Sequence, residues 1–375
     1  MKLTNTFIKA EFHQSHLDYS LMTKRTAEGI VIVLIYVDDL LITGCSKRLI
    51  DNAKQVLKNN FKIKDLGDLR YFLGIEFARN SEGILMHQRK YAMELISDSG
   101  MSGSKPCDTP VEVNQKLTTS EFDDHFKLDN GNDLLDSGEY QRLVGRLLYL
   151  TITRPDIAFV VQSLSQFMHA PKSSHMEAAL RVVKYVKQAP GFGILMSAKP
   201  TNILQGFCDA DWGSCINSRR SITGYMIMFG NSLISWKSKK QPTVSRSSAE
   251  AEYKSLASTV ADVIWLIEMF RELGIEMKLP VKLYCDSKAS LQIAANPVFH
   301  ERTKHIDIDC HFIREKIQNG LVHTLHLSSV EQPADILTKG LSKLQHDHLV
   351  SKLGMKNIFI PPSLKGGIEH MEESG

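Results

Sequence analysis

The sequence predicts an α/β fold in which apolar strands alternate with amphipathic helices. Two apolar runs, 203–208 and 281–285, have the length and composition of buried strands, and an aspartate follows each of them. Between them, residues 248–273 repeat apolar side chains at helical spacing. Upstream, residues 31–44 form two apolar arms around an acidic pair, which is typical of a β-hairpin. These patterns predict folded domains of mixed strands and helices.

Composition agrees with this fold class and excludes several others. The chain has 375 residues, of which 43% are hydrophobic and 23% charged, so we expect two or three folded domains. Six scattered cysteines lack the paired spacing of a zinc site and are expected to be thiols in a reducing compartment. The N-terminus does not resemble a signal peptide, and the hairpin arms are too short to span a bilayer. We expect an intracellular protein, cytoplasmic or nuclear, without a membrane partner or small-molecule cofactor.

The middle of the chain is expected to be helical. The acidic stretch 121–133 is interpreted as a loop, and residues 138–188 follow with apolar side chains at helical spacing. Such a stripe could form a groove for a partner, but it is more often core, and we interpret it as core. Residues after about 353 are rich in Pro, Gly and Glu and are expected to be mobile.

Two aspartates end strands that we expect to be neighbours. Asp209 follows the run 203–208, and Asp286 follows the run 281–285. Neighbouring parallel strands lie about 4.8 Å apart, so two such carboxylates are close enough to share metal ions. An aspartate at a strand end is, taken alone, more often a solvated charge.

The helix predicted at 248–273 carries a third candidate. Ser247 or Ser248 can cap it, and Glu250 and Glu252 follow in its first turn, where the helix dipole favours acids. Glu252 lies on the apolar side with Leu256, so we choose Glu252 as the ligand, although the sequence does not settle Glu250 against it.

Asp335 is the fourth candidate. It follows the strand-like segment 321–327 and Pro333, and it is expected to open a helix at 334–344. Four converging carboxylates repel one another, and divalent cations are the obvious compensation. Hard oxygen ligands suit Mg²⁺ or Mn²⁺ better than zinc.

The order strand-Asp, hairpin, helix-Glu, strand-Asp, helix, strand, helix-Asp resembles the ribonuclease H domain of copia-type LTR retrotransposon Pol polyproteins. The resemblance rests on CDADW at 208–212, RRS at 219–221, ISWKSKKQ at 234–241, TVSRSSAEAEY at 243–253, YCDS at 284–287, RTKHI at 302–306 and ADILTK at 334–339. It implies a mixed five-stranded sheet flanked by helices, with Asp209, Glu252, Asp286 and Asp335 as metal ligands. It also implies two-metal hydrolysis of the RNA strand of an RNA–DNA hybrid. Many members of the wider class carry a mobile histidine before the last aspartate, and its absence from 328–333 predicts slower turnover.

The upstream hairpin resembles the catalytic turn of a reverse transcriptase, with Tyr36, Asp38 and Asp39 in YVDD. The same resemblance extends through KDLGDLRYFLGIE at 64–76, QRKY at 88–91, VGRLLYL at 144–150 and TRPDI at 153–157. Such a polymerase needs a further aspartate on an earlier strand, and Asp18 lacks the required flanks. We therefore expect a truncated polymerase that does not synthesise DNA alone.

The resemblance implies four segments. We expect a reverse-transcriptase palm remnant at 1–110, an acidic loop and helical thumb-like or connection segment at 111–203, a ribonuclease H-like domain at 204–345 and a mobile tail at 346–375.

Net charge is only +3, so local clusters of basic residues are more informative. Such clusters are usually solvated, but beside a metal site for a polyanion they predict phosphate contacts. The candidate nucleic-acid contacts are Arg219, Arg220, Lys237, Lys239, Lys240, Arg246, Arg302, Lys304 and His305.

We therefore expect a ribonuclease H within a truncated reverse transcriptase, acting on RNA–DNA hybrid and associating with other parts of a retrotransposon polyprotein. Two alternatives stay open: a polymerase fragment that needs its missing half, and an inactive relic that only binds nucleic acid.

Overall fold

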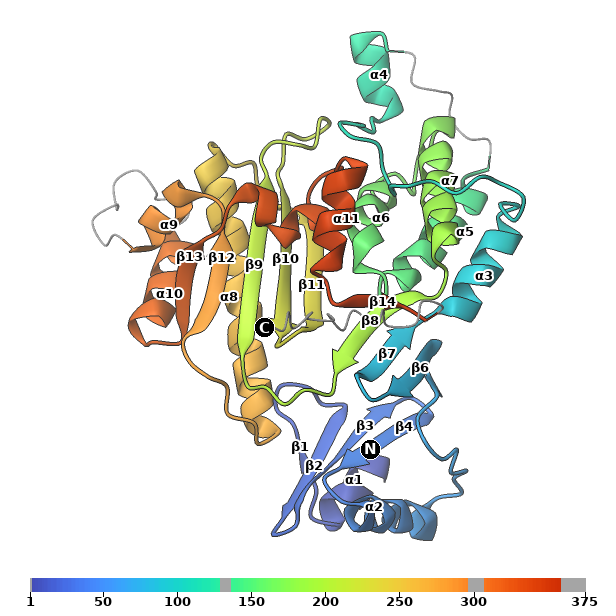
Figure 1. Ribbon diagram of the computed structural model, residues 1–375, viewed down its shortest axis with the longest axis vertical. Helices are drawn as coiled ribbons and strands as arrows, with labels where there is room; N and C mark the ends of the chain where they lie inside the picture. The colour runs from blue at the N-terminus through green and yellow to red at the C-terminus, as the bar shows by residue number, and fades with distance from the viewer. Residues whose placement is uncertain (1, 129–135, 296–306, 359–375) are drawn as a thin grey trace, which may run out of the picture.

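A computed structural model describes residues 2–128, 136–295 and 307–358 (Figure 1). Its strands form three sheets, one of four strands and two of five. None of the helices in these ranges has the length and apolar character that crossing a bilayer requires.

The N-terminal sheet has the order β1-β2-β3-β4 and is antiparallel throughout. Its strands are β1 (His13–Gln14), β2 (Leu21–Thr26), β3 (Gly29–Tyr36) and β4 (Asp39–Gly44), and the helices α1 (Lys2–Lys9) and α2 (Lys47–Asn60) pack against it. The predicted hairpin at 31–44 is confirmed. Its turn is tight because Tyr36 pairs with Asp39, and Val37 adopts a φ of 50° there.

The second sheet combines segments from distant parts of the chain, in the order β14-β8-β7-β6-β5. Its strands are β5 (Tyr71–Phe72), β6 (Ile75–Asn80), β7 (Gly83–His87), β8 (Phe192–Ser197) and β14 (Met355–Asn357). We expected residues 346–375 to be a mobile tail. Instead, α11 (Lys343–Ser351) and β14 are part of the fold, because Leu349, Leu353 and Met355 are buried. Residues 359–375 lie outside the described ranges.

The helical segment is a bundle beside these sheets (Figure 1). It contains α3 (Arg89–Asp98), α4 (Ser120–Phe126), α5 (Ser137–Leu150), η1 (Pro155–Ile157), α6 (Ala158–Ser165) and α7 (Ser173–Gln188). The apolar stripe is core as predicted, since Leu147, Val161 and Leu164 are fully buried. The start of the acidic stretch is a helix rather than a loop: Thr119 caps α4, and buried Asp123 forms an ion pair with buried Lys172.

The third sheet is the mixed five-stranded sheet that the family resemblance implies, in the order β11-β10-β9-β12-β13. Its strands are β9 (Leu204–Asp211), β10 (Ile222–Phe229), β11 (Ser232–Lys240), β12 (Val281–Cys285) and β13 (Val322–His326). β10 is antiparallel to β9 and β11, whereas β12 is parallel to β9 and β13.

Helices cover both faces of the third sheet (Figure 1). The predicted long helix is confirmed as α8 (Ser248–Glu272), which packs on one face with α9 (Lys288–Ala295) and α10 (Asp307–Gln318). The other face packs against α11 and the 3₁₀ turn η4 (Pro333–Leu337). The sheet is therefore enclosed between two apolar cores.

Asp335 does not open the helix that we predicted at 334–344. Residues 333–337 form η4 instead, Thr338 leaves helical geometry with a φ of −127°, and α11 begins only at Lys343. The physical reason is close packing, because η4 lies directly on Gly224 of β10.

Gly224 leaves room for η4. A methyl group at this position would lie 2.5 Å from Thr338 Cγ2 and 2.8 Å from Leu337 Cβ. We therefore predict that Gly224→Ala destabilises the protein by roughly 1–3 kcal/mol, because η4 must move to accommodate it. Denaturant unfolding measures this change.

Gly145→Ala is the matched control. Gly145 lies on the exposed side of α5, and no atom lies within 4 Å of the added methyl group. It should stabilise by up to about 1 kcal/mol, since alanine favours a helix over glycine. Equal effects of the two substitutions would contradict the packing argument.

Candidate functional site

Strand pairing brings two of the candidate carboxylates to the same end of the third sheet. β9 and β12 are parallel, with Cys208 opposite Cys285. Asp209 follows Cys208 and remains inside β9, which continues to Asp211, whereas Asp286 follows β12 as predicted. Asp209 is only 1% exposed. The two carboxylates therefore lie on adjacent strands at the same end of the sheet.

Hydrogen bonds hold the start of α8 at this end of the sheet. Ser255 Oγ donates to the backbone oxygen of Asp209 at 2.9 Å and lies 3.2 Å from that of Gly224. Glu252, one turn earlier, then reaches Asp286 and Cys285, and potential ligand atoms of the three all lie within 4.8 Å of one another. Cys285 was not among the predicted ligands, and its signal in the sequence was its position before Asp286.

Glu250 points into different surroundings. Its carboxylate accepts a hydrogen bond from the Arg246 backbone N–H at 2.7 Å and pairs with Lys254 Nζ at 2.8 Å. Glu252, rather than Glu250, is thus the acid that α8 places beside Asp286.

Asp335 is linked to Asp209 by Lys339, a lysine of the ADILTK motif for which no role was predicted. Lys339 Nζ lies 3.2 Å from Asp209 Oδ2 and 3.2 Å from Asp335 Oδ1. Thr338 Oγ1 donates a second hydrogen bond to Asp209 Oδ2. The available signal was the i, i+4 spacing of Asp335 and Lys339, which places an acid and a base within reach on one turn.

The carboxylates perturb one another. Burial, followed by the charges of Asp209, Cys285 and Asp286, raises the pKa of Glu252 to about 11. Burial and Asp209 raise the pKa of Asp335 to about 7, although Lys339 acts in the opposite direction. Burial opposes the charge of Lys339, but Asp209 and Asp335 outweigh it and raise the pKa of this lysine. Lys339 supplies a single positive charge among four carboxylates, which leaves the site net negative. Its hard oxygen donors fit Mg²⁺ or Mn²⁺.

The loop before η4 contributes two further polar residues. Ser329 lies in η3 (Ser329–Glu331), and its Oγ donates to Asp286 Oδ2 at 2.7 Å. Gln332 is fully buried, and its Nε2 donates to the backbone oxygens of Cys208 at 3.0 Å and Tyr284 at 3.3 Å. Gln332 therefore ties this loop to both strands that precede the aspartates, and Ser329 fixes one of those aspartates.

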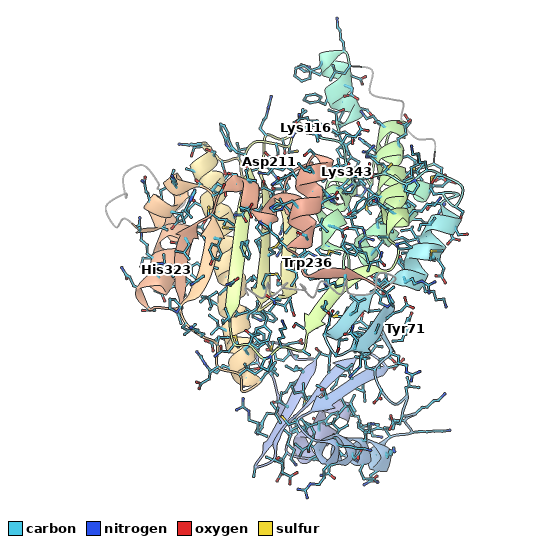
Figure 2. The ribbon with its side chains drawn as sticks, viewed as in Figure 1. Tyr71, Lys116, Asp211, Trp236, His323 and Lys343 are labelled. Carbon is cyan, nitrogen blue, oxygen red and sulfur yellow. The ribbon has the colours of Figure 1, made fainter. Side chains whose placement is uncertain are left out.

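Several of the predicted basic residues lie in the loops at this end of the sheet. Arg219 and Arg220 are exposed in the loop between β9 and β10, and Arg246 is exposed just before α8. Asp211, at the end of β9, lies at the same end beside Lys116, 4.0 Å away (Figure 2). These arginines can therefore contact a ligand that approaches the carboxylates.

The remaining basic candidates differ in their exposure and contacts. Lys237 and Lys239 are exposed on edge strand β11, whereas Lys240 Nζ donates to Oε1 of Gln166, the residue after α6, at 2.6 Å and serves as an internal contact. The candidates Arg302, Lys304 and His305 lie outside the described residues.

The YVDD residues occupy a separate place. Tyr36, Asp38 and Asp39 lie at the β3–β4 turn of the N-terminal sheet, where Tyr36 is 54% exposed. Within the described ranges, no third acidic, His or Cys side chain joins Asp38 and Asp39 in a group of metal-binding size. These carboxylates do not contribute to the cluster on the third sheet.

Comparison with known proteins identifies relatives along nearly the whole chain. Residues 1–113 match the family described as reverse transcriptase (RNA-dependent DNA polymerase). The chain is 40% identical over 363 residues to the retrovirus-related Pol polyprotein from transposon RE1 of Arabidopsis thaliana, a match that covers 97% of this chain and 24% of that protein. It therefore spans about a quarter of that relative.

Two further matches cover most of the other protein. The chain is 30% identical over 264 residues to the putative transposon Ty5-1 protein YCL074W of Saccharomyces cerevisiae, covering 70% of this chain and 83% of that protein. Among solved structures, LC11-RNase H1 in complex with RNA/DNA hybrid matches with a TM-score of 0.29 and 15% identity, covering 36% of this chain and 93% of that one.

The surroundings of Glu252 and Glu250 predict opposite behaviour in two substitutions. With a pKa of about 11, Glu252 carries its proton at pH 7 without metal, so Glu252→Gln should change stability by less than about 1 kcal/mol. It should nevertheless abolish stabilisation by Mn²⁺, which needs the carboxylate. Thermal unfolding with and without Mn²⁺ measures both effects.

Glu250→Gln is the comparison. It removes the buried pair with Lys254, so we expect roughly 1–3 kcal/mol of destabilisation with stabilisation by Mn²⁺ retained. The reverse pattern would assign the metal to Glu250.

Proposed function

Because the chain belongs to the family of Pol polyproteins of copia-type retrotransposons, we propose that residues 204–345 hydrolyse the RNA strand of RNA–DNA hybrids. The observation that carries the proposal is the arrangement of carboxylates at one end of a mixed sheet. Ligand atoms of Glu252 and Asp286 lie within 4.8 Å of each other, and Asp209, whose charge acts on Glu252, is linked to Asp335 by Lys339. Asp209, Glu252, Asp286 and Asp335 are the proposed ligands.

The electrostatics support a site built for cations. Hydration normally stabilises ionised carboxylates, but Asp209, Glu252 and Asp335 are each less than 8% exposed. Burying carboxylates together is costly unless positive charge compensates them. Divalent cations held by the four carboxylates would activate the attacking water and stabilise the departing 3′ oxygen.

The protein's own contribution is positioning. Thr338 holds Asp209 in the sheet, Ser329 orients Asp286, and Ser255 fixes the start of α8 so that Glu252 reaches over the strand ends. These contacts set the carboxylates before substrate arrives, so that little reorganisation accompanies the reaction.

Substrate contact is assigned to the exposed arginines at the same end. Arg219, Arg220 and Arg246 are exposed, and in this proposal they contact backbone phosphates, so that binding weakens with salt. Choice of the RNA strand would rest on its 2′-hydroxyls and on the shape of the hybrid rather than on base identity.

The direct test compares the chain with its Asp209→Asn variant on labelled RNA–DNA hybrid, duplex DNA and duplex RNA in Mg²⁺ or Mn²⁺. We predict that only the hybrid is cleaved and that the cleavage rate falls by more than about a hundredfold in the variant. Loss of a metal ligand should reduce activity more than loss of a residue that supports a ligand. Circular dichroism checks that the variant folds.

Two outcomes would oppose the proposal. Cleavage that survives Asp209→Asn would place the chemistry elsewhere. Metal-independent binding of the hybrid without cleavage, unaffected by Asp286→Asn, would instead favour a relic that only binds nucleic acid.

A second candidate function is supported by the match of residues 1–113 to reverse transcriptases and by the exposed YVDD turn. In this proposal, Asp38 and Asp39 contribute to RNA-directed DNA synthesis together with a third carboxylate from additional polypeptide. Templated synthesis after addition of the preceding segment of a relative, lost in Asp38→Asn, would support it.

A further inference from the structure

Lys339 occupies a position that the proposed function assigns to a metal ion. Its Nζ lies 3.2 Å from one oxygen of Asp209 and 3.2 Å from one oxygen of Asp335, between two carboxylates proposed as ligands. Lys339 also donates its backbone N–H to the backbone oxygen of Asp335 at 3.1 Å, so its main chain is fixed to the same turn.

We propose that Lys339 is a displaceable internal cation, which holds Asp209 and Asp335 together without metal and is expelled when a divalent ion binds between them. The inference rests on the proposed function, because it assumes that these carboxylates bind metal. It assigns Lys339 a positioning role toward the ion.

The surroundings of Lys339 allow its ammonium group to leave. The side chain is 34% exposed, and four flexible carbons separate its charge from the fixed backbone. Asp209 keeps a second donor, Thr338 Oγ1, so it stays in place when the lysine departs.

A permanent buried ion pair in the same protein looks different. Arg154 contacts Asp156 through three hydrogen bonds of 2.7–3.2 Å, and both side chains are at most 2% exposed. Tyr185 donates to the same carboxylate at 2.7 Å. That arrangement is enclosed on all sides, whereas Lys339 contacts its carboxylates at 3.2–3.4 Å and its side chain is 34% exposed.

Displacement has a measurable consequence for metal affinity. An incoming ion must break two charge-assisted contacts of Lys339, so the lysine and the ion compete for the same oxygens. Removing the competitor should strengthen metal binding, whereas removing a merely structural residue would weaken it or leave it unchanged.

The first experiment is calorimetric titration of Mn²⁺ into the full chain, its Lys339→Met and Lys339→Arg variants, and the control Lys343→Met. Lys343 pairs with Asp108 at 2.7 Å, and both side chains are more than half exposed. We expect Lys339→Met to bind Mn²⁺ roughly five- to tenfold more tightly, and Lys339→Arg and Lys343→Met to stay within about twofold of the parent. Without metal, Lys339→Met should unfold at a lower temperature than the control, and saturating Mn²⁺ should remove that difference.

The second experiment uses the unaltered chain and does not depend on a variant that folds. Brief acetylation followed by peptide mass spectrometry measures the reactivity of each lysine with and without Mn²⁺. Lys339 should be acetylated faster when Mn²⁺ is bound, because its ammonium group is released, whereas Lys343 should be unaffected.

The outcomes separate the two proposals. If Mn²⁺ binds the parent chain but Lys339→Met does not bind it more tightly, or acetylation of Lys339 does not rise, the displaceable cation is wrong and the nuclease proposal stands. If neither the parent nor Lys339→Met binds Mn²⁺, both are overturned.

Discussion

The parallel pairing of β9 with β12 places Cys208 opposite Cys285, and the rest of the site depends on this register. Because side chains alternate along a strand, a slip of one residue would turn Asp209 from the face covered by η4 toward the core beneath α8. The buried amide of Gln332 depends on the same register, since its two hydrogen bonds need the backbone oxygens of both strands side by side. Backbone pairing thus determines where the carboxylates meet.

Once the carboxylates meet, their mutual repulsion dictates the surrounding contacts. Thr338, Ser329 and Lys339 each contact one or two of the acids, and Glu252 is left with the largest rise in pKa among them. This charge imbalance is the physical link between the fold and the proposed chemistry, because the divalent cations that would compensate it are also the ones that the proposed hydrolysis uses. The YVDD turn, by contrast, is exposed, and its two acids are adjacent to solvent rather than to other carboxylates.

Periodicity and strand-end residues were enough to predict the long helix α8 and the hairpin, since these depend on local patterns of burial. The mixed five-stranded sheet was expected only from the resemblance to a known family. The choice of Glu252 over Glu250 followed from helical spacing, and the structure places Glu252 beside Asp286. The η4 turn was not predictable, because it arises from contact with Gly224, more than a hundred residues away. The same holds for β14, which pairs with the edge of distant β8 and buries Met355 in the core. Lys339 belongs to the ADILTK motif, but its role could be inferred only once the structure showed that Asp209 lies beside it.

A crystal structure of the chain grown with Mn²⁺, with anomalous scattering used to locate the ions, tests the metal site most directly. We expect Mn²⁺ coordinated by Asp209, Glu252, Asp286 and Asp335, with the Lys339 ammonium withdrawn from Asp209. Strong Mn²⁺ density elsewhere, with Lys339 still bridging Asp209 and Asp335 at saturating metal, would contradict this expectation.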